Sequence, residues 1–216
     1  MAFDLDEQEQ LASIKDWWRR FGNALTWLLI VALVAYASWS GWNYYQRGQS
    51  RQASQLYEEQ QKAVAAKDNV KVQRAAGDME EKFSGTSYAQ MSALVAAKSA
   101  FDANDAAGAK KQLQWTIDHA RDSEYKAIAA VRLAGVLLDE KAYDEGLKVL
   151  SGDFPKQFAG IVSDRKGDLL AAQNKNDAAR TEYQSALDHT EQKDPARQLI
   201  QLKLDAVGGA TAKSAA

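Results

Sequence analysis

Hydrophobic and polar positions divide the chain into one long apolar stretch near the N-terminus and a series of shorter mixed segments after it. No charged residue occurs from Phe21 to Gln46, and the most apolar part of this run extends from Ala24 to Ala37. As a helix, the whole run spans about 39 Å, which exceeds the roughly 30 Å hydrocarbon core of a bilayer. The pattern therefore predicts a membrane-spanning helix over residues 21–46.

An apolar run near an N-terminus also fits an export signal that is cut away. The most apolar segment, Ala24–Ala37, has the length of a signal-peptide core, and Ala35-Tyr36-Ala37 resembles a signal-peptidase site. A signal peptide normally begins with a short basic region, but residues 1–20 contain five acidic and three basic side chains. We therefore favour a helix that is kept, with cleavage after Ala37 as the alternative.

Aromatic residues flank the stretch on both sides, as in the two interfacial belts of a membrane-spanning helix. From Trp18 to Trp42 the distance is about 36 Å at helical rise, close to the separation of the two membrane interfaces. Cleavage would leave the outer belt without its span. The predicted interfacial residues are Trp17, Trp18, Trp39, Trp42, Tyr44 and Tyr45.

Charge counting gives little information on orientation, because three basic residues lie within about 20 residues of each end of the run. The pair Arg19-Arg20 lies closest to the apolar boundary and favours residues 1–20 in the cytoplasm. The apolar positions Leu11, Ile14 and Trp18 recur at helical spacing, so this acidic tail forms either an interfacial helix or an extension of the membrane helix.

From Arg47 to about Val207 the chain is predicted to be helix after helix, and residues 208–216 a disordered tail. The expected fold class is all-α: one transmembrane helix followed by a helical solenoid over residues 47–207. The predicted breaks are clusters of Gly, Asn, Asp, Ser and Pro at residues 84–87, 104–108, 121–124, 151–155, 174–177 and 191–195.

Small and bulky residues recur along these helices with a common spacing. A first small position recurs with a period of about 35 residues, a second lies in the helix that follows it, and a bulky residue comes one helical turn further on. This pattern resembles the tetratricopeptide repeat, in which small residues let paired helices approach closely. The three sets are Ala63, Ala97, Ala134 and Gly167; Ala75, Ala109, Gly146 and Ala179; and Met79, Leu113, Leu150 and Tyr183.

Composition limits the chemistry that the chain can perform. The net charge is −2, which gives no basic excess for nucleic acid, and the absence of cysteine excludes disulfides, thiol catalysis and cysteine-ligated metals. His119 and His189 lie near the predicted ends of two helices, where a basic side chain is favourable. We therefore predict no metal site, no cofactor and no active site.

Asp164 and Asp168 are four residues apart on one predicted helix and are the best candidates for acid–base chemistry. On a solenoid helix, however, such a pair more often forms part of a solvated charged face. A hydrolase carried on a helical scaffold is therefore kept only as a minor alternative.

The concave face of a solenoid, formed by the first helix of each pair, can hold a peptide or a partner's helix. The repeat register places Met91, Lys98, Phe101 and Asp168 on this face, and these are the predicted protein-binding residues. The same register places Leu94, Val131 and Leu138 there too, but as core rather than groove.

The chain resembles the bacterial YfgM family, ancillary subunits of the SecYEG translocon, over nearly its whole length. The resemblance rests on "DEQEQLASIKDWWRRFGNAL" (6–25), the apolar span, and "FAGIVSDRKGDLLAAQNKNDAAR" (158–180). It implies an inner-membrane protein with a cytoplasmic N-terminus and a periplasmic repeat domain, which associates with SecYEG and with the membrane-anchored periplasmic chaperone PpiD.

The expected function is thus a chaperone-like, membrane-tethered protein that binds unfolded exported proteins or partner subunits at the translocon exit. The tether raises the local concentration of a weak binder near emerging chains. A regulatory scaffold that sequesters a signalling protein is the alternative within the binding class.

Overall fold

The computed structural model describes the backbone of residues 5–208 and the side chains of residues 11–208, and this part of the chain is helical apart from its turns and bends. The predicted tail lies, from residue 209 onward, outside the described residues. The elements in chain order are α1 (Leu5–Ala65), α2 (Asn69–Phe83), α3 (Ser87–Asp102), α4 (Ala106–His119), α5 (Ser123–Asp139), α6 (Tyr143–Val149), the short 3-10 helix η1 (Lys156–Phe158), α7 (Ala159–Ala172), α8 (Asn176–His189) and α9 (Ala196–Ala206).

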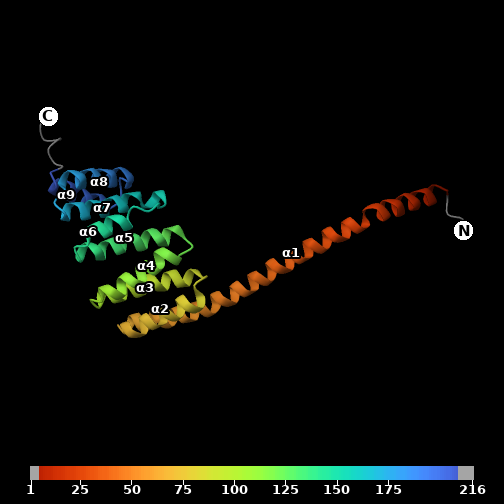
Figure 1. Ribbon diagram of the computed structural model, residues 1–216, viewed down its shortest axis with the longest axis horizontal. Helices are drawn as coiled ribbons and strands as arrows, with labels where there is room; N and C mark the ends of the chain where they lie inside the picture. Colours follow the sequence, from red (N-terminus) through yellow and green to blue (C-terminus); the bar gives the residue numbers. More distant parts are fainter. Residues whose placement is uncertain (1–4, 209–216) are drawn as a thin grey trace, which may run out of the picture. The chain divides into compact units, whose positions relative to one another are not determined.

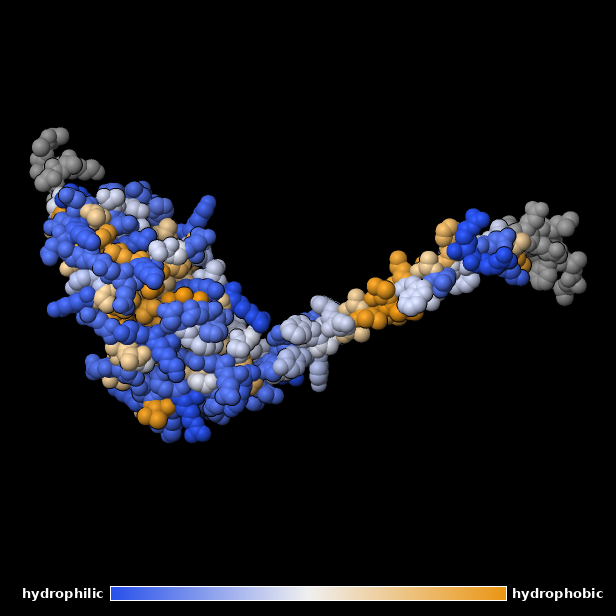
Figure 2. Space-filling view, viewed as in Figure 1, coloured by the Kyte–Doolittle hydropathy of each residue, from blue (hydrophilic) through white to orange (hydrophobic). Residues whose placement is uncertain are grey.

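The chain forms two compact units, Met1–Gln49 and Ser50–Ala216. In the described part of the first unit, α1 is continuous from Leu5, so the residues before the apolar run extend the same helix. One segment of α1 is long and apolar enough to cross a membrane, with a mean hydropathy of 1.7. Its large apolar side chains are exposed, as the orange atoms of α1 show in Figure 2. A helix that is apolar on all sides is typical of a membrane span.

The second unit is a stack of antiparallel helix pairs (Figure 1). We call residues 50–65 of α1, together with α3, α5, α7 and α9, the A helices, and α2, α4, α6 and α8 the B helices. From α2 onward each B helix packs against the A helix that follows it, and α5 also packs against α3 and α7. The predicted tetratricopeptide-like solenoid is therefore confirmed.

Close helix approach depends on the small residues that the repeat pattern singled out. Ala109, Ala134 and Ala179 are completely buried. At Gly167 in α7, an added Cβ atom would lie only 2.5 Å from the Tyr183 ring of α8, so no larger residue fits without movement. The bulky residue that follows each small pair fills the space between helices, as Leu113, Leu150 and Tyr183 do.

Each turn from an A helix to its B helix has the same backbone conformation. One residue of each turn adopts the left-handed conformation, with φ between 54° and 63°, so this conformation recurs once in every repeat. In each turn the residue after the left-handed one donates its N–H to a carbonyl five positions back, as in Asp105 to Ala100 and Lys175 to Leu170. The four left-handed residues are Lys67, Asn104, Lys141 and Asn174.

These turns correct the predicted register of the first repeat. Asp68 donates to Ala63 as Asp105 donates to Ala100, so Ala63 is equivalent to Ala100 and not to Ala97. The position equivalent to Ala97 is Gln60, which is completely buried and donates to the carbonyl of Ser92 at 3.1 Å. Shifting an alanine-rich helix by three residues keeps the same face apolar, so the sequence pattern did not distinguish the two registers.

The helix α9 closes the C-terminal end of the solenoid. Its side chains Ile200 and Leu204 are buried against a cluster that includes Ala179, Tyr183 and Leu187 of α8. The opposite face of α9 exposes Leu199 and Leu202. In an open-ended repeat array, a terminal helix of this kind covers the core of the last repeat.

Candidate protein-binding groove

Two adjoining hollows lie on the A-helix side of the second unit, and we call them together the groove. The first has a volume of about 810 Å³ and is lined mainly by the C-terminal turns of α1, by α3 and by α5. The second, of about 440 Å³, lies between α3, α4, α5 and one side chain of α7. Lys98, Asp102 and Arg132 line both hollows. Each volume falls within the range of roughly 300–1,000 Å³ that is common for binding pockets.

Apolar and aromatic side chains form much of the groove's lining. In the first hollow these are Tyr57, Val64, Met91, Val95 and Tyr125. Burial raises the pKa of the Tyr57 phenol, and the neighbouring Tyr125 and Tyr88 raise it further, so this hydroxyl remains neutral and able to donate at physiological pH.

In the second hollow, Phe101 is 47% exposed although it is a large apolar side chain, and it lies beside Leu113 and Val136. An exposed aromatic ring over an aliphatic floor is the kind of surface that binds an apolar side chain of a partner.

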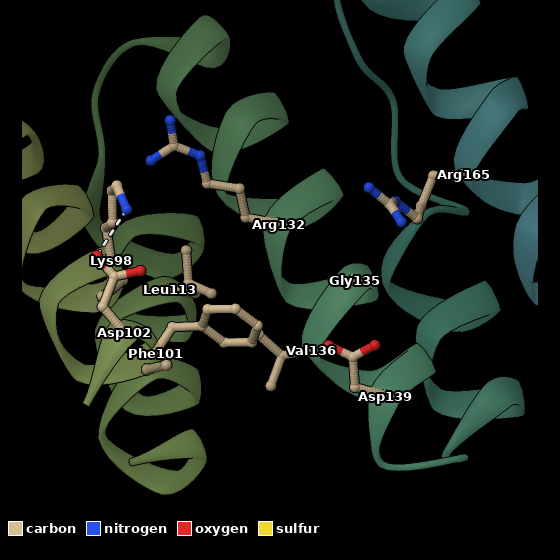
Figure 3. A pocket seen from close by; sticks show the side chains of 11 residues that line it. Lys98, Phe101, Asp102, Leu113, Arg132, Gly135, Val136, Asp139 and Arg165 are labelled. Carbon is tan, nitrogen blue, oxygen red and sulfur yellow. Dashed lines mark hydrogen bonds and ion pairs between the residues drawn. The ribbon is translucent and has the colours of Figure 1, made fainter. Parts of the chain in front are cut away.

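Charged side chains surround this apolar lining. The Lys98 ammonium forms a 2.6 Å ion pair with Asp102. Arg132 is exposed and has no ion-pair or hydrogen-bond partner within residues 11–208. Figure 3 shows Arg132 and Arg165 in the upper half of the view, with Phe101, Val136 and Asp139 below them. The groove thus offers an unpaired guanidinium beside an apolar slot, an arrangement that suits a segment with an apolar side chain and a carboxylate.

The structure places three of the four predicted binding residues in the groove. Met91 lines the first hollow, Phe101 the second, and Lys98 both. Leu94 is 7% exposed and belongs to the core, yet it also lines the first hollow. Val131 and Leu138 lie in the neighbouring core cluster, as predicted.

Asp168 lies outside both hollows, in a cluster of charges between α7 and α9. The Lys203 ammonium contacts Asp168 at 2.8 Å and both carboxylate oxygens of Asp164 at 2.8 and 2.9 Å. The Tyr183 hydroxyl donates to Asp168 at 3.0 Å, and Arg165 lies 3.3 Å from it. Because Lys203 of α9 reaches these carboxylates, the surface that the repeat register assigned to the groove is largely covered here.

Burial changes the titration of two groups in this cluster. It raises the pKa of Asp164, and the neighbouring Asp168 carboxylate adds to the effect while Lys203 opposes it. Burial also raises the pKa of Tyr183, together with the carboxylate that accepts its hydrogen bond. The two carboxylates share one ammonium and serve to hold α9 on α7, so their spacing has a structural explanation.

The two histidines occupy equivalent places at the ends of α4 and α8. The Nδ1 atom of His119 bonds to the Trp115 carbonyl at 3.0 Å, and that of His189 to the Ser185 carbonyl at 2.8 Å. Since a carbonyl only accepts, Nδ1 carries the proton in both rings. Within residues 11–208 no three His, Asp or Glu side chains are grouped so that they could hold a metal ion.

Sequence reasoning missed Arg132 and Arg165 as groove residues. The two arginines occupy the same position of successive repeats, because each lies nine residues before a left-handed turn residue, Lys141 or Asn174. A search for charged residues repeated at one register position would have found them. Tyr57 and Tyr125 carried no such signal, since each appears as an ordinary apolar helix position.

The fold defines a helical-repeat protein of the tetratricopeptide-like class. Residues 15–209 match the tetratricopeptide repeat-like domain family. Three relatives named "Ancillary SecYEG translocon subunit" are similar over most of their length. The protein of Neisseria gonorrhoeae is 31% identical over 96% of this chain and 100% of its own, that of Haemophilus influenzae 25% over 95% and 99%, and that of Escherichia coli 28% over 84% and 87%.

The chain therefore belongs to the family of ancillary SecYEG translocon subunits, the YfgM family, which its sequence resembles.

Proposed function

We propose that this chain is an ancillary subunit of the SecYEG translocon that binds protein segments in its groove at the membrane surface. The observation that carries the proposal is the open groove with an apolar lining and an unpaired arginine, on a chain that is similar to a subunit of that name over 96% of its length. Sites of protein recognition typically combine aromatic anchors with arginine at the centre of the contact.

The apolar part of α1 serves in this proposal as a membrane anchor that is not cleaved. Residues 1–20 lie in the cytoplasm, residues 21–46 span the inner membrane and residues 47–207 lie in the periplasm. Trp17, Trp18, Trp39, Trp42, Tyr44 and Tyr45 lie at the two interfaces. The support for this arrangement is that all six aromatic side chains are exposed on α1, where a membrane interface favours them.

The client in this proposal is a newly exported, unfolded chain, and the partner is the membrane-anchored chaperone PpiD. An unfolded chain exposes apolar side chains one after another, and the groove presents two adjoining apolar hollows to receive them. Anchoring the groove beside the translocon exit raises its effective concentration toward emerging chains, so that a modest affinity suffices. No chemical step is required of the chain.

Met91, Lys98 and Phe101 contact the bound segment, with Phe101 as the apolar anchor. Arg132 receives a carboxylate of the segment, because it is exposed and lacks a partner within the described residues. Replacing an exposed aromatic anchor typically costs binding rather than folding.

The test compares two variants purified as tagged full chains from membranes in mild detergent. Phe101→Ala removes the anchor, and Leu202→Ala removes an exposed apolar side chain from α9, outside the groove. We expect SecYEG subunits and PpiD to copurify with the unaltered chain and with Leu202→Ala. An exported chain that is crosslinked to the unaltered protein should no longer be crosslinked to Phe101→Ala.

Mass spectrometry of the bait identifies its N-terminus in the same experiment. A bait that begins at Ser38 and copurifies without translocon subunits would refute the anchored arrangement. Client crosslinking that survives Phe101→Ala but disappears when residues 1–20 are deleted would instead favour a regulatory scaffold that acts through its tail.

A further inference from the structure

A third hollow lies away from the groove, between the α2–α3 loop and the C-terminal end of α4. It has a volume of about 160 Å³, and its lining includes Ser84, Ser87, Gln90, Trp115 and Arg121. This volume is below the range of whole-ligand pockets, so the hollow has room for one functional group of a ligand.

The N-terminus of α3 opens into this hollow without a side-chain cap. Thr86 occupies the N-cap position, but its hydroxyl donates to the Phe83 carbonyl at 2.8 Å and caps no helix N–H. An aspartate caps the first turn of α2, α4 and α5, whereas α3, like α6 to α9, has no side-chain cap. The helix α3 therefore presents uncapped N–H groups and the positive end of its dipole to the hollow.

Gln90 provides an independent indication of a ligand. Its side chain lines the hollow, is only 5% exposed and makes no hydrogen bond to any residue that the structure describes. Its amide atoms are not sealed within the protein, so they are available to a group bound in the hollow. A ligand oxygen in the hollow would accept from its NH₂ group.

The charge of the lining is positive. The Arg121 guanidinium lies against the loop at Gly85, where an added Cβ atom would be 3.1 Å from its Nη2. None of the lining residues, all of which are among the described ones, is acidic. Outside the lining, the Glu80 carboxylate interacts electrostatically with His119. Burial raises the pKa of Glu80.

We propose that this hollow is a binding site for a phosphate group. The lining offers two serine hydroxyls, the Gln90 amide, the Arg121 guanidinium and the N–H groups of α3, contributed by the α2–α3 loop, α3 and the segment after α4. This set of donors suits the oxygens of a phosphate. The group comes either from free phosphate compounds or from a phospholipid headgroup, and both sources offer the same oxygens.

The experiment uses fluorine NMR of the full chain labelled with 5-fluorotryptophan. Trp115 lines the hollow, and the other five tryptophans lie between positions 17 and 42, so a Trp115→Phe variant assigns its signal. Inorganic phosphate is titrated into the chain in dodecyl maltoside, a detergent without phosphate, against sodium chloride at equal ionic strength. Arg121→Gln is the test variant, and Arg132→Gln changes a similarly exposed arginine in the groove.

We expect phosphate to shift the Trp115 signal saturably, and Arg121→Gln to raise the half-saturating concentration about tenfold. Arg132→Gln should leave that concentration unchanged. The absence of a saturable shift, or an equal shift in the Arg121→Gln variant, overturns the proposal.

Phospholipid nanodiscs distinguish the two sources. If the Trp115 signal of the unaltered chain already has its bound position there without added phosphate, and returns to the free position in Arg121→Gln, the headgroup is the ligand. If the signal moves only on addition of phosphate, the ligand is a free phosphate compound. The groove takes no part in these readouts, so the result is independent of the proposed translocon function.

Discussion

The helices α3 and α7 occupy equivalent places in the solenoid, but the surface of α3 is open and the equivalent surface of α7 is covered. Leu94 and Lys98 of α3 lie ten and six residues before the left-handed turn residue Asn104, and Asp164 and Asp168 of α7 lie at the same distances before Asn174. The first pair lines an open groove. The second pair is largely buried and shares an ion pair with Lys203 of α9.

The difference shows that repeat geometry defines a position, whereas the next helix decides whether that position is exposed. On α3 the charge of Lys98 remains at the surface, with a side chain 68% exposed, and its ion pair with Asp102 is weak in water. On α7 the side chains of Asp164 and Asp168 are only 19% and 14% exposed. Charges at this depth require a partner, and α9 supplies it.

The largest expected effect follows from removing that partner. Lys203→Met leaves two carboxylates between α7 and α9 without an ammonium, and we expect a loss of about 2 kcal/mol in the free energy of unfolding. Urea unfolding of the full chain in dodecyl maltoside, followed by circular dichroism, measures this loss.

Two further variants control this measurement. Lys193→Met removes an exposed lysine that has no ion pair within the described residues, and it should change the unfolding free energy by less than about 0.5 kcal/mol. Adding Asp164→Asn and Asp168→Asn to Lys203→Met should restore part of the loss, because the two buried carboxylates are then removed and only the more exposed Arg165 is left without its partner. A Lys203→Met protein as stable as the Lys193→Met control would show that α9 is not held by this cluster.

The next effect contrasts two glycines of the A helices. Gly167→Ala places a methyl group 2.5 Å from the Tyr183 ring, and we expect a destabilisation of about 1–3 kcal/mol from overpacking. Gly135→Ala places the methyl group 3.6 Å from the Arg165 guanidinium, an ordinary contact, and alanine favours the helix by up to about 1 kcal/mol. The same unfolding assay should therefore show a loss of stability for Gly167→Ala and a gain for Gly135→Ala. A change of the same sign in both variants would contradict the distinction between closed and open surfaces.

The sequence predicted the turns that carry a local signal and missed those that packing imposes. Asn104 and Asn174 were found because asparagine tolerates the left-handed conformation. Lys67 and Lys141 adopt the same conformation without any such preference, since the helices on either side require the turn. The turn at Lys67 also determines the register of the first repeat. Because the sequence pattern did not reveal this turn, it placed the first small position of that repeat three residues too late.

The groove was predicted in part for a similar reason. Met91, Lys98 and Phe101 could be placed from the repeat register alone. The position of Asp168 depends on Lys203, which lies much later in the chain, in a helix whose packing no local pattern indicates. Contacts between the last repeat and a terminal helix do not recur in the chain, so the repeat pattern contains no information about them.

A smaller effect concerns pH and the closed cluster. Because the pKa of Asp164 is raised in the folded chain, the folded state binds more protons than the unfolded state above the ordinary carboxyl pKa. The stability of the unaltered chain relative to Asp164→Asn should therefore increase as the pH falls from about 6 to 4, by at most about 1.4 kcal/mol per pH unit. Unfolding curves of both proteins across this range check the sign, and the opposite slope would mean that Lys203 dominates over burial.

The smallest effect on stability is expected on the open surface. Arg132 is exposed and lacks a partner in residues 11–208, so its charge contributes little to folding, and Arg132→Gln should change the unfolding free energy by less than about 0.5 kcal/mol. Crosslinking of exported chains to the same purified variant should nevertheless fall severalfold, because a carboxylate of the bound segment loses its guanidinium. A variant that binds normally would exclude Arg132 from recognition, whereas one that unfolds readily would show that the groove's charges hold the solenoid together, as Lys203 does at its end.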